Sequence, residues 1–392
     1  MKITLKMIGK FVPLLHNLRT LKKEDNAGLL YKMDYTGDYY PLLPILEGVF
    51  KTGCTVFAPR MPDGTMLLGR NFDLRHFYRD PATGEEEITG LITVLNCRNK
   101  KAKYASVGVC DAMYLDPSCK IFHRGSFDRK DKNTLRALML PFLTMDGVNE
   151  KGLAVSILHL STDNNFEEAE YREPSSLNSE EKRNLVLLKN PGEEPDVKNG
   201  RLTKWSIILN TADKKAWKVN KARATFQTEP GKKTVIHTVL MRMMLDSCQN
   251  CEEAIALAKS VNLISTPDSD NHIMVTDPNR SVILEWIDNK LTVEECYHAS
   301  NFYNNRADHF GYGYNRDDVL KAELENNPGG LSEEECMKAL EKASQNCLKG
   351  KDHGYTQWSA VYNLKKQTLR LTVHSDYEHV YMYALENPGL LK

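Results

Sequence analysis

Short apolar runs bounded by turn residues dominate the chain from about residue 54 onwards, a pattern typical of β-strands. Two runs flank a Pro-Asp-Gly turn at 62–64 and two more flank an Asn-Glu-Lys-Gly turn at 149–152, so each pair predicts a hairpin. The predicted strands are 54–60, 65–74, 88–96, 104–110, 143–148, 153–160, 272–277, 281–288, 290–296, 359–366, 368–374 and 379–385.

Helical spacing of apolar residues is confined to a few segments. It predicts helices at 234–248, 251–261 and 333–344, with Asp246-Ser247 as the cap between the first two. Residues 1 to about 50 are expected to be mainly helical and loop-like. A few amphipathic helices among antiparallel strand pairs favour an α+β layered fold over a parallel βαβ sheet.

A polar, charged stretch interrupts this pattern at about 162–232. We expect a solvated surface insertion there. The alternative is a lid that gates access of a substrate.

The charge balance argues against a nucleic acid as partner. Lys plus Arg and Asp plus Glu are 52 each, so the formal net charge is zero, whereas nucleic-acid binders usually carry a basic excess.

No stretch approaches the ~18 apolar residues of a membrane span, so no stable membrane insertion is expected. Three lysines interrupt the first ten residues, which favours an amphipathic segment over a signal peptide.

The nine cysteines are scattered and odd in number, which does not resemble a secreted disulfide framework. A reducing, cytoplasmic location is therefore predicted. Cys248 and Cys251 form the only Cys-x-x-Cys motif and have no second ligand pair at zinc-like spacing, so we expect two incidental thiols and no metal or cofactor.

The first hairpin brings chemically useful side chains together. If Asp63-Gly64 is a two-residue loop, paired positions sum to 127 and Cys54 lies directly across from Asp73. A register slip of one residue would separate them onto opposite faces. Arg70 is three residues from Asp73, so an ideal strand points it the other way.

Cys54-Thr55, the Pro-Asp-Gly turn and the run Gly-Arg-Asn-Phe-Asp at 69–73 together resemble the opening hairpin of the choloylglycine hydrolase family, which includes bile salt hydrolases and penicillin V acylases and has acid ceramidase as a relative. In that family the nucleophilic Cys is followed 16 residues later by Arg and 19 later by Asp, and Cys54, Arg70 and Asp73 match both intervals. Outside the polar insertion the resemblance covers roughly 54–385. The other matching segments are 149–154, the Leu-Glu-Trp-Ile-Asp strand at 284–288, 300–303 and 356–363.

This resemblance implies the fold of N-terminal-nucleophile hydrolases, a four-layer αββα sandwich of two antiparallel sheets. It also implies that Cys54 attacks a linear, non-peptide amide, with its own α-amino group as the base. That amine exists only after cleavage behind Gly53, so residues 1–53 would be a pro-segment that is removed or nicked by self-cleavage. Asp73 would orient the amine, and Arg70 would lower the pKa of the thiol.

Three further positions follow from the resemblance. Asn301 matches the oxyanion-hole asparagine, and its plain alternative is a strand-end turn residue. His159 falls where bile salt hydrolases have Asn, and it either donates one hydrogen bond or caps the strand. Arg316 matches a second active-site Arg, and the alternative is a surface Arg beside Asp317 and Asp318.

The expected partner is a small-molecule N-acyl amide such as an N-acyl amino acid, N-acyl amine, bile salt or ceramide-like lipid, and a homo-oligomer stays open. Two other functions remain open as well. An acyltransferase would use the same acyl-enzyme and pass the acyl group to an amine. A catalytically inactive binding protein of the same fold would not cleave behind Gly53.

Overall fold

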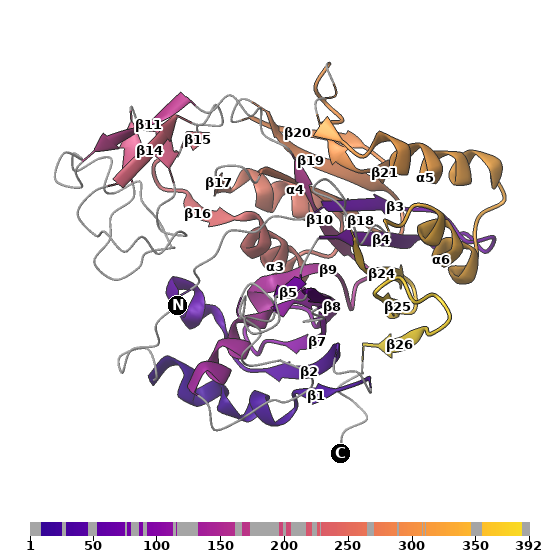
Figure 1. Cartoon of the computed structure of the whole chain (residues 1–392), viewed down its shortest axis with the longest axis horizontal. Helices are drawn as coiled ribbons and strands as arrows, with labels where there is room; N and C mark the ends of the chain where they lie inside the picture. Colours follow the sequence, from indigo (N-terminus) through magenta and orange to yellow (C-terminus); the bar gives the residue numbers. More distant parts are fainter. Residues whose placement is uncertain are drawn as a thin grey trace.

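Two large sheets packed face to face form the centre of the molecule (Figure 1). The computed structural model describes residues 9–25, 29–45, 53–74, 77–79, 86–88, 92–112, 115, 132–160, 167–172, 196–198, 201–204, 217–221, 226–227, 229–264, 270–287, 290–307, 309, 311–345 and 355–385.

The larger sheet has nine strands. In spatial order they are β1 (Lys22–Lys23), β2 (Leu30–Thr36), β7 (Ile92–Arg98), β8 (Ser106–Asp111), β9 (Thr144–Asn149), β10 (Ala154–Leu160), β18 (Asp270–Thr276), β19 (Ser281–Ile287) and β20 (Lys290–Glu295). All neighbours are antiparallel except β2 and β7, which run parallel. Strands β7, β8, β9 and β10 are buried at almost every position, so this part of the sheet is covered on both faces.

The smaller main sheet has six strands. Their order is β21 (His298–Ala299), β3 (Gly53–Phe57), β4 (Leu67–Asp73), β24 (Thr356–Asn363), β25 (Thr368–Val373) and β26 (Tyr381–Ala384). Strand β3 packs against β10 of the larger sheet, which joins the two sheets face to face.

Helices cover the two outer faces. On the nine-stranded sheet α3 (His237–Ser247) packs on β9, β10 and β18, and α4 (Cys251–Lys259) follows it. On the six-stranded sheet α6 (Glu333–Lys342) packs on β4 and β24, and α5 (Tyr314–Asn326) packs on β3. The predicted α+β fold with four αββα layers is confirmed.

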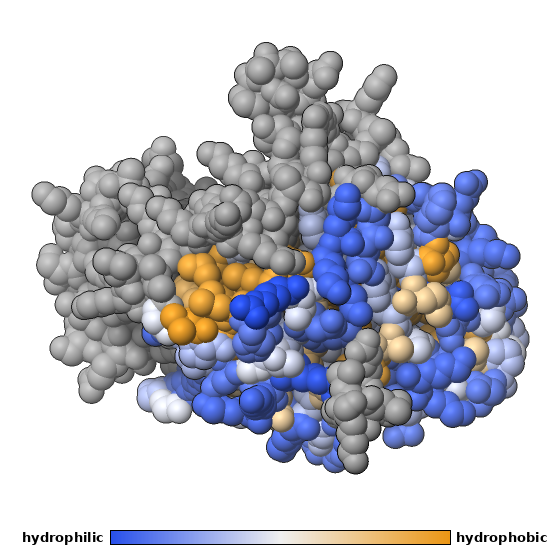
Figure 2. Space-filling view, turned by 90° about the horizontal axis from the view of Figure 1, so that it is seen from below, coloured by the Kyte–Doolittle hydropathy of each residue, from blue (hydrophilic) through white to orange (hydrophobic). Residues whose placement is uncertain are grey.

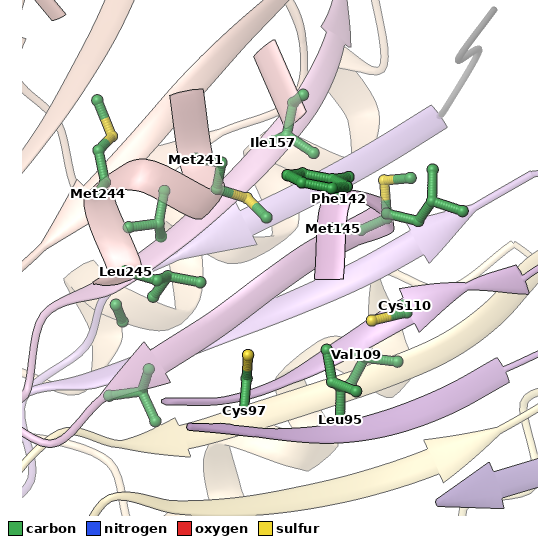
Figure 3. Packing of buried hydrophobic residues seen from close by; sticks show 14 of the residues in the cluster. Leu95, Cys97, Val109, Cys110, Phe142, Met145, Ile157, Met241, Met244 and Leu245 are labelled. Atoms are coloured by element: carbon green, nitrogen blue, oxygen red, sulfur yellow. The ribbon is translucent and has the colours of Figure 1, made fainter. Parts of the chain in front are cut away.

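Buried apolar side chains fill the space under α3, as Figure 3 shows for Met241, Leu245 and Ile157. The 3₁₀ segment η5 (Lys132–Leu143) adds Phe142 to the same cluster. A second, smaller cluster lies between the six-stranded sheet and α5 and α6. Each sheet therefore has its own helical cover and its own core contacts.

The segment before Gly53 differs from the prediction of helix and loop. Residues 30–36 form strand β2, and residues 12–19 and 40–45 form the 3₁₀ segments η1 (Val12–Arg19) and η2 (Tyr40–Ile45). The prediction overlooked a strand pattern that is present, because Tyr31, Met33 and Tyr35 alternate strictly with Lys32, Asp34 and Thr36. Part of the expected pro-segment is thus built into the nine-stranded sheet.

Three other boundaries differ. Residues 233–236 are strand β16 (Lys233–Ile236), paired in parallel with β17 (Val261–Ile264), so the first helix begins only at His237. Helix α4 is capped by Asn250, whose side chain accepts from the Glu253 N–H at 2.9 Å, and not by Asp246-Ser247. Helix α5 was not predicted, because few apolar residues mark its buried side.

The polar insertion lies largely outside the described residues. Its described parts form two small sheets, separate in their hydrogen bonding from the main ones and seen at upper left in Figure 1. One pairs β11 (Glu167–Arg172) with β14 (Trp217–Lys221). The other joins β12 (Asp196–Lys198), β13 (Arg201–Lys204) and β15 (Phe226–Gln227).

The remaining short pairs are β5 (Phe77–Arg79) with β6 (Glu86–Ile88), and β22 (Asn301–Phe302) with β23 (Gly311–Tyr312).

On the face shown in Figure 2 the described surface is mostly hydrophilic, and its largest apolar area lies beside the grey atoms. None of the described helices is both long and apolar enough to cross a membrane.

Candidate active site

The hairpin β3–β4 has a different register from the predicted one. Paired residues sum to 126, so Cys54 lies opposite Phe72, and Gly53 lies opposite Asp73. The loop has three residues instead of two: the Met61 N–H donates to Thr65 O at 2.8 Å, and Gly64 has φ +83°. Pro62 fits the first central position of the type I turn that such loops use, which the Asp-Gly loop assumption ignored.

The corrected register places Cys54 and Arg70 on the same face of the sheet. Arg70 Nη2 lies 2.8 Å from Cys54 Sγ, and both side chains are fully buried. A fixed guanidinium at this distance favours the thiolate over the thiol. Arg70 therefore contacts the sulfur with no need of the strand bulge that the predicted register would have required.

Arg70 is held from several sides. Its Nη1 forms a buried ion pair with Asp146 of β9, and its Nη2 also donates to Ile157 O at 3.0 Å. Its guanidinium lies over the rings of Phe72 and Trp358, at 4.7 and 5.5 Å from the centroids. Burial alone would lower the pKa of Arg70, but the charges of Cys54 and Asp146 raise it above its ordinary value, so it stays a cation.

Asp73 lies on the opposite face of β4 and binds a different set of groups. Its carboxylate accepts from Arg316 Nη1 and from Thr356 Oγ1, each at 2.6 Å, and from Gln345 Nε2 at 3.2 Å. Burial raises the pKa of Asp73 above its ordinary value, against the opposing effect of Arg316. Asp73 therefore reaches Cys54 through Arg316.

Arg316, near the start of α5, is a buried member of the site and not a surface residue. Its Nη1 donates to Cys54 O at 3.1 Å and to Thr55 Oγ1 at 2.6 Å. Its Nη2 donates to Asn301 Oδ1 at 2.7 Å. Gly313 leaves room for this guanidinium, since a Cβ there would stand 2.5 Å from Arg316 Nη2.

Asn301 holds the nitrogen of Cys54. Its Oδ1 accepts from the Cys54 N–H at 3.0 Å and from Arg316, while its Nδ2 donates to His159 O at 2.7 Å. Two donors face the oxygen and one acceptor faces the nitrogen, which fixes the orientation of the amide. Ser300 Oγ adds a donor to Cys54 O at 3.2 Å.

His159 joins this cluster through its backbone. Its carbonyl binds Asn301, whereas its ring Nδ1 lies 3.3 Å from the Tyr312 hydroxyl of β23. The ring is thus paired with an aromatic residue whose side chain is partly exposed.

The structure brings together Cys54, Arg70, Asp73, Asn301 and Arg316, with His159 at the edge. Sequence reasoning missed the residues that support them. Asp146 had a detectable signal, because a lone carboxylate stands inside the apolar run 143–148. Ser300 and Thr356 lie in the matching segments 300–303 and 356–363 but were given no role there, and Gln345, which follows α6, carried no signal of its own.

The other thiols are of a different kind. Burial raises the pKa of Cys97 to about 11 and that of Cys110 to about 12, so both remain protonated and inert at neutral pH. The seven cysteines within the described ranges are free thiols. Those ranges contain no group of three His, Cys, Asp or Glu side chains that could hold a metal ion.

No protein-family model matches the sequence, and no curated protein does either. Among solved structures, a mutant of conjugated bile acid hydrolase from Clostridium perfringens matches at 14% identity and TM-score 0.47, covering 85% of this chain and 93% of that one. A variant of the same hydrolase matches at 14% identity and TM-score 0.46, covering 85% and 94%.

Penicillin V acylase from Agrobacterium tumefaciens matches at 12% identity and TM-score 0.44, covering 84% of each chain.

Proposed function

We propose that the chain is a cysteine N-terminal-nucleophile hydrolase that cleaves a linear, non-peptide amide after cutting itself between Gly53 and Cys54. One observation carries the proposal. Cys54 has a cation 2.8 Å from its sulfur, and side chains bind both its backbone nitrogen and its carbonyl oxygen. A buried structural cysteine needs none of these contacts.

In the self-cleavage step, the sulfur attacks the carbonyl carbon of Gly53 and the proton of the thiol passes to the Cys54 nitrogen. The C–N bond breaks and a thioester remains. Water hydrolyses the thioester, which leaves a carboxylate on Gly53 and both a thiol and an α-amine on Cys54. Gly53 has no side chain to obstruct the attack.

In the hydrolytic cycle the new α-amine takes the proton of the thiol, and its reference pKa of ~7.7–8 suits a base near neutrality. The thiolate attacks the substrate carbonyl, and the amine returns the proton to the leaving nitrogen. Water then releases the acyl group as an acid. Arg70 stabilises the thiolate before it attacks and again when the acyl group leaves.

The roles of the other residues follow from their contacts. Asn301 Oδ1 keeps the Cys54 nitrogen in place, and the second hydrogen of Nδ2 would donate to the substrate oxyanion. Arg316 fixes the Cys54 carbonyl and the Asn301 oxygen together. Asp73 orients Arg316, and the backbone of His159 orients Asn301.

Cleavage behind Gly53 would nick the chain without releasing the pro-segment. Strand β2 pairs with β7 along seven residues, and Tyr39 and Tyr40 donate to the carboxylate of Asp246 in α3. Many apolar residues ahead of the cut are buried as well.

The free thiols within the described ranges fit a reducing compartment, so the cytoplasm is the proposed location.

Intact mass of the purified protein tests the proposal. We expect a fragment that begins at Cys54, absent in Cys54→Ala and present in the matched control Cys110→Ala. The cut protein should then release acid from a panel of N-acyl amino acids and N-acyl amines. An uncut chain that hydrolyses these amides would contradict the amine mechanism, and a cut chain inactive on the whole panel would contradict the substrate class.

A further inference from the structure

We propose that His272 and Glu285 form a buried charged pair that positions Ser300 and Asn301 against Cys54. The inference rests on the proposed function, because it assigns how that same site is held. His272 and Glu285 act on Cys54 through the chain around Ser300 and Asn301, so both are positioning residues.

Glu285 of β19 ties down the turn that follows β22. Its Oε1 accepts from the Asn304 N–H and its Oε2 from the Asn305 N–H, each at 2.8 Å, and the side chain is fully buried. Hydrogen bonds from backbone N–H groups to an ionised carboxylate are among the stronger ones in proteins. Burial alone would raise the pKa of Glu285, but the hydrogen bonds from His272 and the two N–H groups keep it below its ordinary value.

His272 of β18 faces an acceptor at both ring nitrogens. Its Nδ1 lies 2.8 Å from Glu285 Oε1, and its Nε2 lies 2.8 Å from Ser300 O. A neutral imidazole has one donor and one acceptor nitrogen, so it satisfies only one of these oxygens. Because Glu285 is ionised and has no proton to offer, both ring nitrogens must donate, and the ring is an imidazolium.

The imidazolium acts on the site through Ser300. Its bond to Ser300 O fixes the peptide that leads into Asn301, while Ser300 Oγ donates to Cys54 O at 3.2 Å. The next residue after Ser300 is Asn301, whose Oδ1 accepts a hydrogen bond from the Cys54 N–H. Glu285 fixes the chain just after Asn301 and His272 fixes it just before, so the pair sets the position of both groups that hold the Cys54 backbone.

Within the described ranges, the pair interacts with two further ionisable groups, His237 of α3 and Cys296, which follows β20. Burial lowers the pKa of His237 to about 3 and raises that of Cys296 to about 12, so both stay neutral near pH 7. A change in the charge of the pair can therefore be measured without titration of these neighbours.

The first test replaces Glu285 by its neutral isostere and uses the chain's own Gly53–Cys54 bond as the substrate. In Glu285→Gln the imidazolium loses its anion, and the Asn304 and Asn305 N–H groups lose a charged acceptor. We expect self-cleavage at pH 8 to slow at least tenfold.

Asp277→Asn is the matched control. Asp277 is equally buried and accepts from the N–H groups of Cys251, Asn279 and Arg280, at the other end of the β18–β19 hairpin. The Asp277→Asn variant should lose about as much thermal stability as Glu285→Gln and should still cut itself as the wild type does. Equal cleavage rates for Glu285→Gln and the wild type, or equal slowing in both variants, would overturn the proposal.

A second measurement does not depend on how the variants fold. In the Cys54→Ala chain, labelled with ¹⁵N-histidine, both ring nitrogens of His272 should carry protons at pH 7. A neutral tautomer would refute the charged pair. If the wild type never cuts itself while His272 proves doubly protonated, the proposed function fails and the charged pair stands.

Discussion

Arg70 and Asp73 stand three residues apart on β4 and act on Cys54 from opposite faces of the six-stranded sheet. Arg70 contacts the sulfur directly at 2.8 Å, whereas Asp73 acts through Arg316, which binds the Cys54 carbonyl. A spacing of three residues places the two side chains on opposite faces of the strand. Arg70 can therefore contact the sulfur while Asp73 contacts Arg316. One strand end supplies a cation to the side chain of Cys54 and, through Arg316, an anchor to its backbone.

Replacing Arg70 by Lys should slow self-cleavage about tenfold or more, because one ammonium cannot bind the sulfur, Asp146 and Ile157 O in the planar geometry of a guanidinium. The rate is measured by mass spectrometry of freshly refolded chain. Arg242→Lys is the matched control, since Arg242 forms an equally buried ion pair with Asp246. If both variants lose stability but cut at equal rates, the role of Arg70 is structural only.

Replacing Asn301 by Ala should lower the rate of self-cleavage by ~100-fold, which is what loss of one preorganised donor typically costs. The change also removes the acceptor of the Cys54 N–H and of Arg316 Nη2. Asn327→Ala serves as control, because Asn327 caps the end of α5 with a bond to Glu323 O at 2.8 Å. A near-normal rate in Asn301→Ala would refute its role.

Replacing His159 by Ala should leave self-cleavage within about threefold of the wild type, since Asn301 binds the backbone carbonyl of His159 and not its ring. Hydrolysis of N-acyl amides is the second readout, because the ring and the Tyr312 hydroxyl lie beside Asn301. A 100-fold loss of self-cleavage would instead mark the ring as an oxyanion donor.

The cut protein should behave as one particle. Fragments 1–53 and 54–392 are expected to co-elute in size exclusion under native conditions and to separate only in denaturant, because β2 stays paired with β7. Mass spectrometry of the eluted peak identifies both fragments. Recovery of 54–392 alone, still folded and active, would contradict this expectation.

Stability should fall as the pH drops from about 6.5 towards 4. His237 is buried, and its pKa is lowered to about 3, so the unfolded chain binds a proton that the folded chain does not. This difference in proton binding does not change the free energy of unfolding above pH 6.5. Below that value it lowers the free energy of unfolding by about 1.4 kcal/mol for each pH unit.

Urea unfolding of the wild type and of His237→Asn at pH 7.5 and pH 5 measures this loss. The wild type should lose about 2 kcal/mol more between the two pH values than the variant, while the carboxylates contribute equally to both proteins. Equal losses would show that His237 does not govern the acid sensitivity.

Local pattern was enough to predict most of the strands and the layered α+β fold, because buried strands have a clear apolar signature. It could not predict partners between distant segments. The parallel pairing of β2 with β7 and the ion pair of Arg70 with Asp146 join residues whose neighbourhood exists only in the folded chain. Helix α5, which supplies Arg316, lacks a marked apolar face.

The hairpin register shows how little separates a right prediction from a wrong one. Counting Asp63-Gly64 as the whole loop moved every pair by one residue and set Cys54 against Asp73 in place of Phe72. Pro62 was the residue that could have corrected the count. Spacing along the chain selected side chains that do lie together, although the register inferred for the hairpin was wrong.

The parallel pairing of β2 with β7 also fixes a sequence of events during synthesis. Residues 30–36 leave the ribosome before residues 92–98, with the Gly53–Cys54 bond between them, so β2 must wait for its neighbour strand to emerge. A bond cut during that interval would let the earlier piece diffuse away. If the proposed cut depends on Arg70, Asn301 and Arg316, which come from distant parts of the chain, it is delayed until assembly is complete.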